Sequence, residues 1–111
     1  QIAVLTNVPD KHRLRRQNNL KSHGFNYPVI ANRGGKGPIV ERIKQDMTQP
    51  LVFVDDLPPQ ITSVAAHAPD THLVHFVGDP RLAKLIGKAP EAHVRIDDWQ
   101  KLKTHLIDYI K

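Results

Sequence analysis

The chain has 111 residues, 40% of them hydrophobic and 24% charged, which is typical of one globular domain. It contains no cysteine, which excludes disulfides, thiolate metal sites and cysteine nucleophiles and favours a cytoplasmic protein. The formal net charge of +5 suggests an anionic partner. No apolar run approaches the roughly 20 residues of a membrane helix, so we expect no membrane partner.

Five short runs rich in apolar and β-branched residues recur along the chain, and a helical pattern follows each. They predict strands at residues 2–6, 27–31, 51–55, 72–77 and 92–96. The first helix is expected from Asp10, as its N-cap, to about Ser22. It ends at His23-Gly24, because glycine suits the left-handed backbone of a helix C-terminus.

The later helices are expected to bury an apolar stripe or to begin at an acidic cap. The second begins at about Lys36, and its stripe is Ile39, Val40, Ile43 and Met47. The stripe of the third is Ile61, Val64, Ala65 and Ala68. The fourth is short, with Asp79 as cap, Pro80 as first residue and then Leu82, Leu85 and Ile86. The last begins at Asp97 or Asp98 and buries Trp99, Leu102, Leu106 and Ile110.

Strands that alternate with helices at this spacing imply βα units and a parallel sheet covered on both faces. We therefore predict an α/β protein with a Rossmann-like three-layer fold. Ligands of such sheets bind beyond the carboxyl ends of the strands. The residues that follow the predicted strands are Thr6-Asn7, residues 32–36, Asp55-Asp56, Gly78-Asp79 and Asp97-Asp98.

Asp55 and Asp56 stand side by side after an apolar run and before a double proline. Adjacent carboxylates repel, so a divalent cation, a nearby Lys or Arg, or a helix N-terminus must compensate them. One Asp is explained as a cap for the helix that starts near Pro58, but a cap does not explain two. The pair therefore favours a metal site.

Three segments in order resemble the second, third and fourth motifs of the haloacid-dehalogenase (HAD) superfamily of phosphohydrolases. They are "IAVLTN" with Thr6, "GGKGPIVERI" with Lys36 at the start of a helix, and "LVFVDD" with Asp55 and Asp56. The resemblance covers nearly the whole chain. It implies a HAD-like core and a Mg²⁺-dependent phosphatase that acts on a phosphorylated substrate.

The resemblance also implies a role for each residue. Thr6 would bind a phosphoryl oxygen, and Lys36 would stabilise negative charge on the nucleophile and the transferred group, so both are catalytic candidates. Asn7 would contact the substrate. Asp55 and Asp56 would hold Mg²⁺, which carboxylates, waters and phosphate oxygens usually bind.

One motif of the superfamily is missing from these residues. The nucleophile would be the first Asp of an Asp-x-Asp on an earlier, central strand, between the strands that carry Thr6 and "VFVDD". No Asp-x-Asp occurs in the chain. We therefore expect residues 1–111 to form a single HAD-like domain that lacks an N-terminal strand, and a segment upstream of Gln1 to supply that strand, with or without the nucleophile.

The stretch between Thr6 and Lys36 has no room for an inserted cap domain. Without a cap elsewhere, both phosphorylated small molecules and phosphorylated macromolecules are open as substrates.

Two other functions are compatible with the sequence. The first is a noncatalytic HAD-like protein that keeps the fold for binding or assembly. The second is a basic nucleic-acid-binding module, which a cationic helix suggests: Lys11, Arg13, Arg15, Arg16 and Lys21. We favour an exposed helix face there, and an aromatic content of 5% argues against base stacking.

The seven histidines do not predict a metal site. His72 and His75 are three residues apart on one strand, so they point to opposite faces. His67, His93 and His105 have no partner at ligand spacing in the sequence. The oligomeric state is not predicted.

Overall fold

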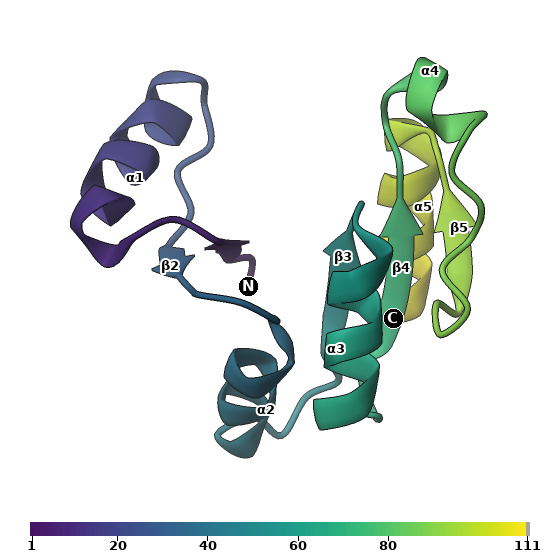
Figure 1. Ribbon diagram of the computed structural model, residues 1–111, viewed down its shortest axis with the longest axis horizontal. Helices are drawn as coiled ribbons and strands as arrows, with labels where there is room; N and C mark the ends of the chain where they lie inside the picture. The colour runs from purple at the N-terminus through teal and green to yellow at the C-terminus, as the bar shows by residue number, and fades with distance from the viewer. Residues whose placement is uncertain (111) are drawn as a thin grey trace. The chain divides into compact units, whose positions relative to one another are not determined.

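A computed structural model describes residues 1–110, which form parts of two compact units, Gln1–Lys36 and Gly37–Lys111 (Figure 1). Both units are mixed α/β, and every strand pair in them is parallel. No helix within residues 1–110 is long and apolar enough to cross a membrane.

The first unit contains two short strands and one helix. β1 (Val4–Thr6) pairs with β2 (Val29–Ala31), and between them lie the 3₁₀ turn η1 (Asp10–His12) and helix α1 (Arg13–Ser22). α1 buries none of its residues. Gly24, with φ of 88°, ends the helix in the left-handed conformation, as the sequence predicted.

The second unit contains a three-stranded sheet and four helices. Its elements are α2 (Gly37–Gln45), β3 (Val52–Asp55), α3 (Pro58–His67), β4 (His72–Phe76), α4 (Pro80–Ala83), β5 (Val94–Ile96) and α5 (Trp99–Ile110). The strand order is β3-β4-β5. α3 covers one face of this sheet and α5 covers the other, which gives the unit three layers (Figure 1).

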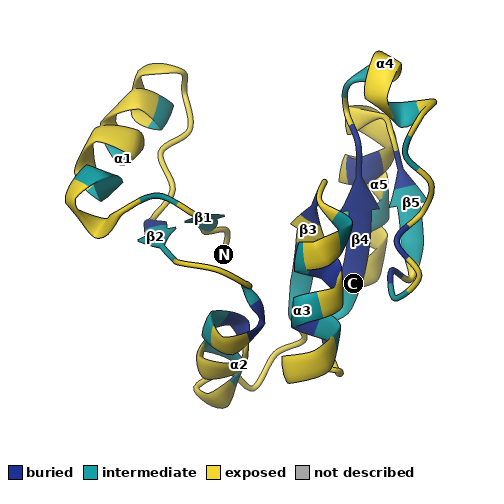
Figure 2. Cartoon of the chain, in the orientation of Figure 1, coloured by how far each residue is buried: buried dark blue, intermediate teal, exposed yellow. Residues whose placement is uncertain are grey.

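The core of the second unit lies on the central strand β4. On the α5 face, Val74, Phe76 and Ile96 pack against Leu102. On α3, Ile61 and Val64 are completely buried. Most of β4 is coloured as buried in Figure 2. Burial of β4 on both faces explains why its sequence is a nearly continuous apolar run.

α2 and α3 pack closely because one residue of α2 has no side chain. The backbone N–H of Gly37 donates to Ser63 Oγ at 2.9 Å. A Cβ on Gly37 would lie 2.2 Å from the backbone oxygen of Ser63, which is too close for any other residue. The glycine therefore fixes where α2 crosses α3.

The predicted strands and helices are confirmed as parallel βα units, but parts of the helix predictions are wrong. Asp10 lies in η1 and does not cap α1, whose N-cap is His12. α2 ends at Gln45, so Met47 lies outside it and is 36% exposed. α4 ends at Ala83 and does not reach Leu85. In α5, Leu102 is buried but Trp99 and Ile110 are 68% and 73% exposed. Both exposed residues lie at the ends of α5, because the helix is longer than the short strands that it packs against.

Candidate functional site

Three polar side chains lie side by side at the carboxyl end of the second unit's sheet. In the strand register, Asp55 of β3 is opposite His75 of β4, and His75 is opposite Arg95 of β5. Residues in register on neighbouring parallel strands point to the same face, about 4.8 Å apart. We call Asp55, His75 and Arg95 the polar row.

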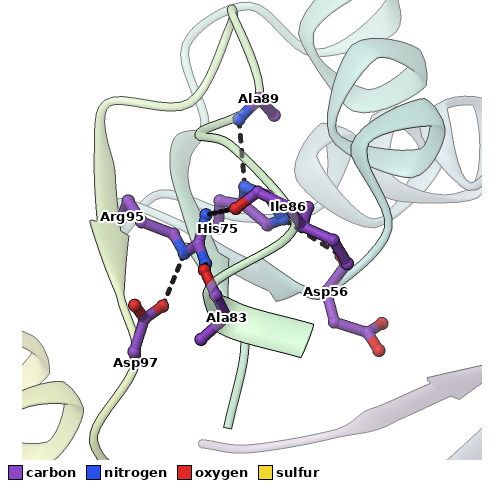
Figure 3. Close-up of polar contacts among 7 residues, drawn as sticks. All are labelled: Asp56, His75, Ala83, Ile86, Ala89, Arg95 and Asp97. Atoms are coloured by element: carbon purple, nitrogen blue, oxygen red, sulfur yellow. Dashed lines mark hydrogen bonds and ion pairs between the residues drawn. The ribbon is translucent and has the colours of Figure 1, made fainter. Parts of the chain in front are cut away.

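His75 is the centre of the polar row and is completely buried. Its Nδ1 accepts the backbone N–H of Ala89 at 3.0 Å, and Nε2 lies 3.0 Å from the backbone oxygen of Asp56 (Figure 3). Because Nδ1 uses its lone pair, the neutral ring carries its proton on Nε2 and donates it to Asp56. His75 thus ties the loop after β3 to the segment before β5.

Arg95 holds a second loop at the same edge. Its Nη1 and Nη2 donate to the backbone oxygens of Ile86, at 2.5 Å, and Ala83, at 3.0 Å (Figure 3). Its Nε pairs with Asp97 Oδ1 at 2.5 Å. The Arg95 side chain is 15% exposed, so these contacts satisfy a largely buried charged group.

The two carboxylates of the acidic pair have different surroundings. Asp55 is buried, and its Oδ1 accepts the backbone N–H of Leu57 at 2.9 Å. Asp56 is exposed, and its carboxylate makes no hydrogen bond or ion pair with any other described residue. Leu57 is the N-cap of α3, and no side chain caps that helix. Turn formation therefore accounts for Asp55 but not for Asp56.

The acidic pair suits a hard cation that needs few protein ligands. Mg²⁺ usually takes one or two carboxylates and completes its shell with water and phosphate oxygens. Within residues 1–110 no three His, Asp or Glu side chains gather into a group that could hold a metal ion. A cation at this edge would therefore have Asp55 and Asp56 as its carboxylate ligands among the described residues.

The first unit gathers its own polar residues where β1 and β2 end. The Asn7 side chain donates to the backbone oxygen of Gly34 at 2.9 Å and accepts from Asn32 Nδ2 at 3.1 Å. Gly34 has a φ of 72°, which a residue with a side chain adopts only at a cost. The amide of Asn7 thus orders the loop from residue 32 to residue 36.

The sequence-predicted residues are divided between the two units. Thr6, Asn7 and Lys36 belong to the first unit, and Asp55 and Asp56 to the second. Thr6 is the last residue of β1 and is partly buried. Lys36 is partly buried and directly precedes α2.

Asp79 and Asp98 act as helix caps, as the sequence predicted, whereas Asp97 pairs with Arg95. Asp79 Oδ1 accepts the backbone N–H of Arg81 at 2.9 Å, and the Arg81 side chain lowers the pKa of the Asp79 carboxyl. Asp98 Oδ1 accepts the N–H of Lys101 in the first turn of α5.

Sequence reasoning missed His75 and Arg95. Both are polar residues inside apolar strand runs, and each stands 20 residues after its partner in the polar row. That repeated spacing was the available signal. The histidines also have partners that the sequence did not predict, because His93 and His105 both stack on His72.

Comparison of the chain with protein-family models, with curated proteins and with solved structures gives no match.

Proposed function

We propose that the chain is part of a Mg²⁺-dependent phosphohydrolase of the HAD type. The observation that carries this proposal is the acidic pair at the carboxyl end of β3. One carboxylate is buried and held by the backbone, and its neighbour is exposed without a partner among residues 1–110. An exposed carboxylate at the ligand-binding edge of a parallel sheet is suited to hold a cation that a substrate phosphate also contacts.

Each proposed residue has a distinct task. Asp55 and Asp56 would hold Mg²⁺, which when bound neutralises charge on a phosphoryl group. The Thr6 hydroxyl would donate a hydrogen bond to a phosphoryl oxygen, and Asn7 would keep the loop after β2 in place beside it. The Lys36 ammonium would stabilise negative charge on the group being transferred.

The proposal requires an Asp nucleophile from a segment outside residues 1–111, because these residues contain no Asp-x-Asp. Open strand edges are compatible with such a segment. Among the described residues β1 pairs only with β2, and β3 pairs only with β4. Each of these strands can accept one more parallel neighbour on its other edge.

The test measures Mg²⁺-dependent hydrolysis of a chromogenic phosphate monoester by the complete natural protein. Asp56→Asn removes the exposed charge and keeps the shape, so we expect turnover to fall at least about tenfold. Asp70→Asn is the matched control, because Asp70 is also exposed but precedes β4 at the amino end of the sheet, and it should keep wild-type turnover. Wild-type turnover in Asp56→Asn would remove the metal assignment.

A binding measurement separates this function from a noncatalytic relative. Titration of residues 1–111 with MgCl₂, followed by NMR, should shift the amide signals of Asp56 and Leu57 and leave that of Asp70 unchanged. Absence of both Mg²⁺ binding and hydrolysis would favour the noncatalytic binding or assembly protein.

A second candidate function rests on how charge is distributed. Residues 1–36 hold seven of the sixteen Lys and Arg residues but one of the eleven Asp and Glu residues. That one, Asp10, lies 3.9 Å from Arg13. Lys11 of η1 and Arg15 and Arg16 of α1 are exposed and have no acidic partner among the described residues. Such a surface suits phosphates of a nucleic acid.

The salt dependence of binding tests this alternative. If the helix contacts phosphates, Arg15→Glu/Arg16→Glu should weaken binding to a DNA duplex and reduce the slope of log K against log salt by about 2. Lys84→Glu/Lys103→Glu makes the same charge change in the second unit and should leave the slope unchanged. Equal effects of both double variants would show a nonspecific response to net charge.

A further inference from the structure

Three histidines and a tyrosine gather at the amino end of the second unit's sheet, away from the carboxyl edge. His72 begins β4, His93 precedes β5, and His105 and Tyr109 lie one turn apart on α5. The His72 ring stacks on His93 and His105, each with centroids 5.1 Å apart, and on Tyr109 at 4.1 Å. We call these four residues the histidine cluster.

The contacts of the histidine cluster limit how many protons it can hold. His72 Nε2 and His105 Nε2 lie 2.8 Å apart. A hydrogen bond between two ring nitrogens needs one N–H and one lone pair, so at least one of these Nε2 atoms is unprotonated. His93 Nδ1 accepts the backbone N–H of Leu73 at 2.9 Å and must also be unprotonated. The folded arrangement therefore requires a neutral His93 ring and at least one neutral ring in the pair of His72 and His105.

Added protons would break both contacts. With an N–H on both His72 Nε2 and His105 Nε2, two donors would face each other at hydrogen-bond distance. With an N–H on His93 Nδ1, the backbone N–H of Leu73 would lose its acceptor. Burial, followed by the charges of His105 and His93, lowers the pKa of His72, which is the direction expected if the cluster resists protonation.

The charged groups around the cluster are few. On α5, Lys101 and Asp108 border the groove that His105 also lines, so one charge of each sign lies on that side. On β3, the register partner of His72 is the apolar Val52. On β5, Val94 follows His93 directly.

The cluster joins α5 to the sheet at one end of the helix. Leu102, earlier in α5, is buried in the core, whereas the side chains after Leu106 are more exposed. Ile107 and Ile110 are 42% and 73% exposed, so apolar packing contributes little to holding the end of the helix. The contacts of His105 and Tyr109 with His72 also hold this end of the helix on the sheet.

We propose that the histidine cluster is a proton-operated clasp. With the hydrogen bonds of His72, His93 and His105 intact it holds the end of α5 on the amino end of the sheet, and added protons that break these bonds release that end while the rest of the unit stays folded.

Hydrogen exchange of the full chain, followed residue by residue with NMR between about pH 8 and about pH 5, tests this directly. After correction for intrinsic rates, protection of the Leu73 amide and of amides beyond His105 should fall about tenfold or more relative to that of Val74. Equal loss of protection at all three places, or none, would overturn the clasp.

A second test uses a variant whose substituted side chains keep the hydrogen bonds but do not take up protons. In His93→Asn/His105→Gln, the Asn oxygen replaces the Nδ1 acceptor and the Gln amide replaces Nε2, so protection beyond residue 105 should no longer depend on pH. His67→Gln, an exposed change on α3, is the control and should keep the wild-type response. A double variant with the wild-type pH response would refute the proposal.

The tautomers of the unaltered chain give a test that does not depend on whether variants fold. At about pH 8, ¹⁵N shifts should show His93 protonated on Nε2 and not on Nδ1. A proton on His93 Nδ1 at that pH would contradict the geometry on which the proposal rests.

Discussion

Replacement of His75 by leucine tests the central contact of the polar row. Leucine has a similar volume and suits a strand that is buried on both faces, but it can neither accept the Ala89 N–H nor donate to the Asp56 oxygen. The change therefore removes two hydrogen bonds with little change in packing.

The cost follows from the burial of the two orphaned groups. Ala89 is 1% exposed, so its N–H is left without a partner in the interior, at a cost of about 1–3 kcal/mol. Asp56 is exposed and its oxygen can turn to water, so that lost bond costs about 0.5–1.5 kcal/mol. We expect His75→Leu to lower the free energy of unfolding by about 2–4 kcal/mol, a large part of the stability of a small protein.

Urea denaturation measures the free-energy loss, which should move the midpoint down by about 1–2 M. Hydrogen exchange of the Ala89 amide shows whether the loss of stability arises at this contact. His75→Asn is the matched variant: its side-chain oxygen can still accept the Ala89 N–H, so that amide should stay protected in His75→Asn and become exchangeable in His75→Leu. A loss below about 0.5 kcal/mol in His75→Leu would show that the buried ring is not holding the two segments.

Three further changes test separate parts of the second unit. Gly37→Ala should lower the free energy of unfolding by about 1–3 kcal/mol in urea denaturation, because its Cβ would meet the Ser63 backbone; Gly87→Ala, with open space around it, should change stability by less than about 0.5 kcal/mol. Thr71→Val should raise stability by about 1 kcal/mol, because the Thr71 hydroxyl is buried and has no hydrogen-bond partner among the described residues; unchanged or lower thermal stability would contradict this. The pKa of His72 is lowered from 6.5 in the folded chain, so the unfolded chain takes up this proton at a higher pH than the folded chain does. As the pH decreases below about 7.5, the free energy of unfolding should therefore decrease until the lowered pKa is passed. The difference in that free energy between wild type and His72→Gln should shrink over the same pH range.

The sequence was sufficient to predict the order of strands and helices, because each element carries a local signal. Alternating apolar runs predicted parallel βα units, Gly24 predicted the end of α1, and Asp79 predicted the start of α4. The assignments of Thr6 and Lys36 as catalytic residues remain predictions.

Features that depend on contacts between distant residues were not predictable in this way. An apolar stripe on α5 shows which residues share a face, but not that the sheet is too short to cover both Trp99 and Ile110. The partners of His72 come from another loop and another helix, at separations that no motif marks. How much of a helix is buried, and which distant side chains meet, are decided only when the strands pair in register.

The bonds of Arg95 have a consequence for the order of folding. α4 has four residues, too few to offset the entropic cost of starting a helix. Arg95 donates hydrogen bonds to the carbonyls of Ala83 and Ile86, which it follows by twelve and nine residues. Without these bonds the end of α4 would fray. We therefore expect the segment between β4 and β5 to become ordered after β5 docks. If these contacts form late in folding, weakening them should speed unfolding and leave the folding rate nearly unchanged.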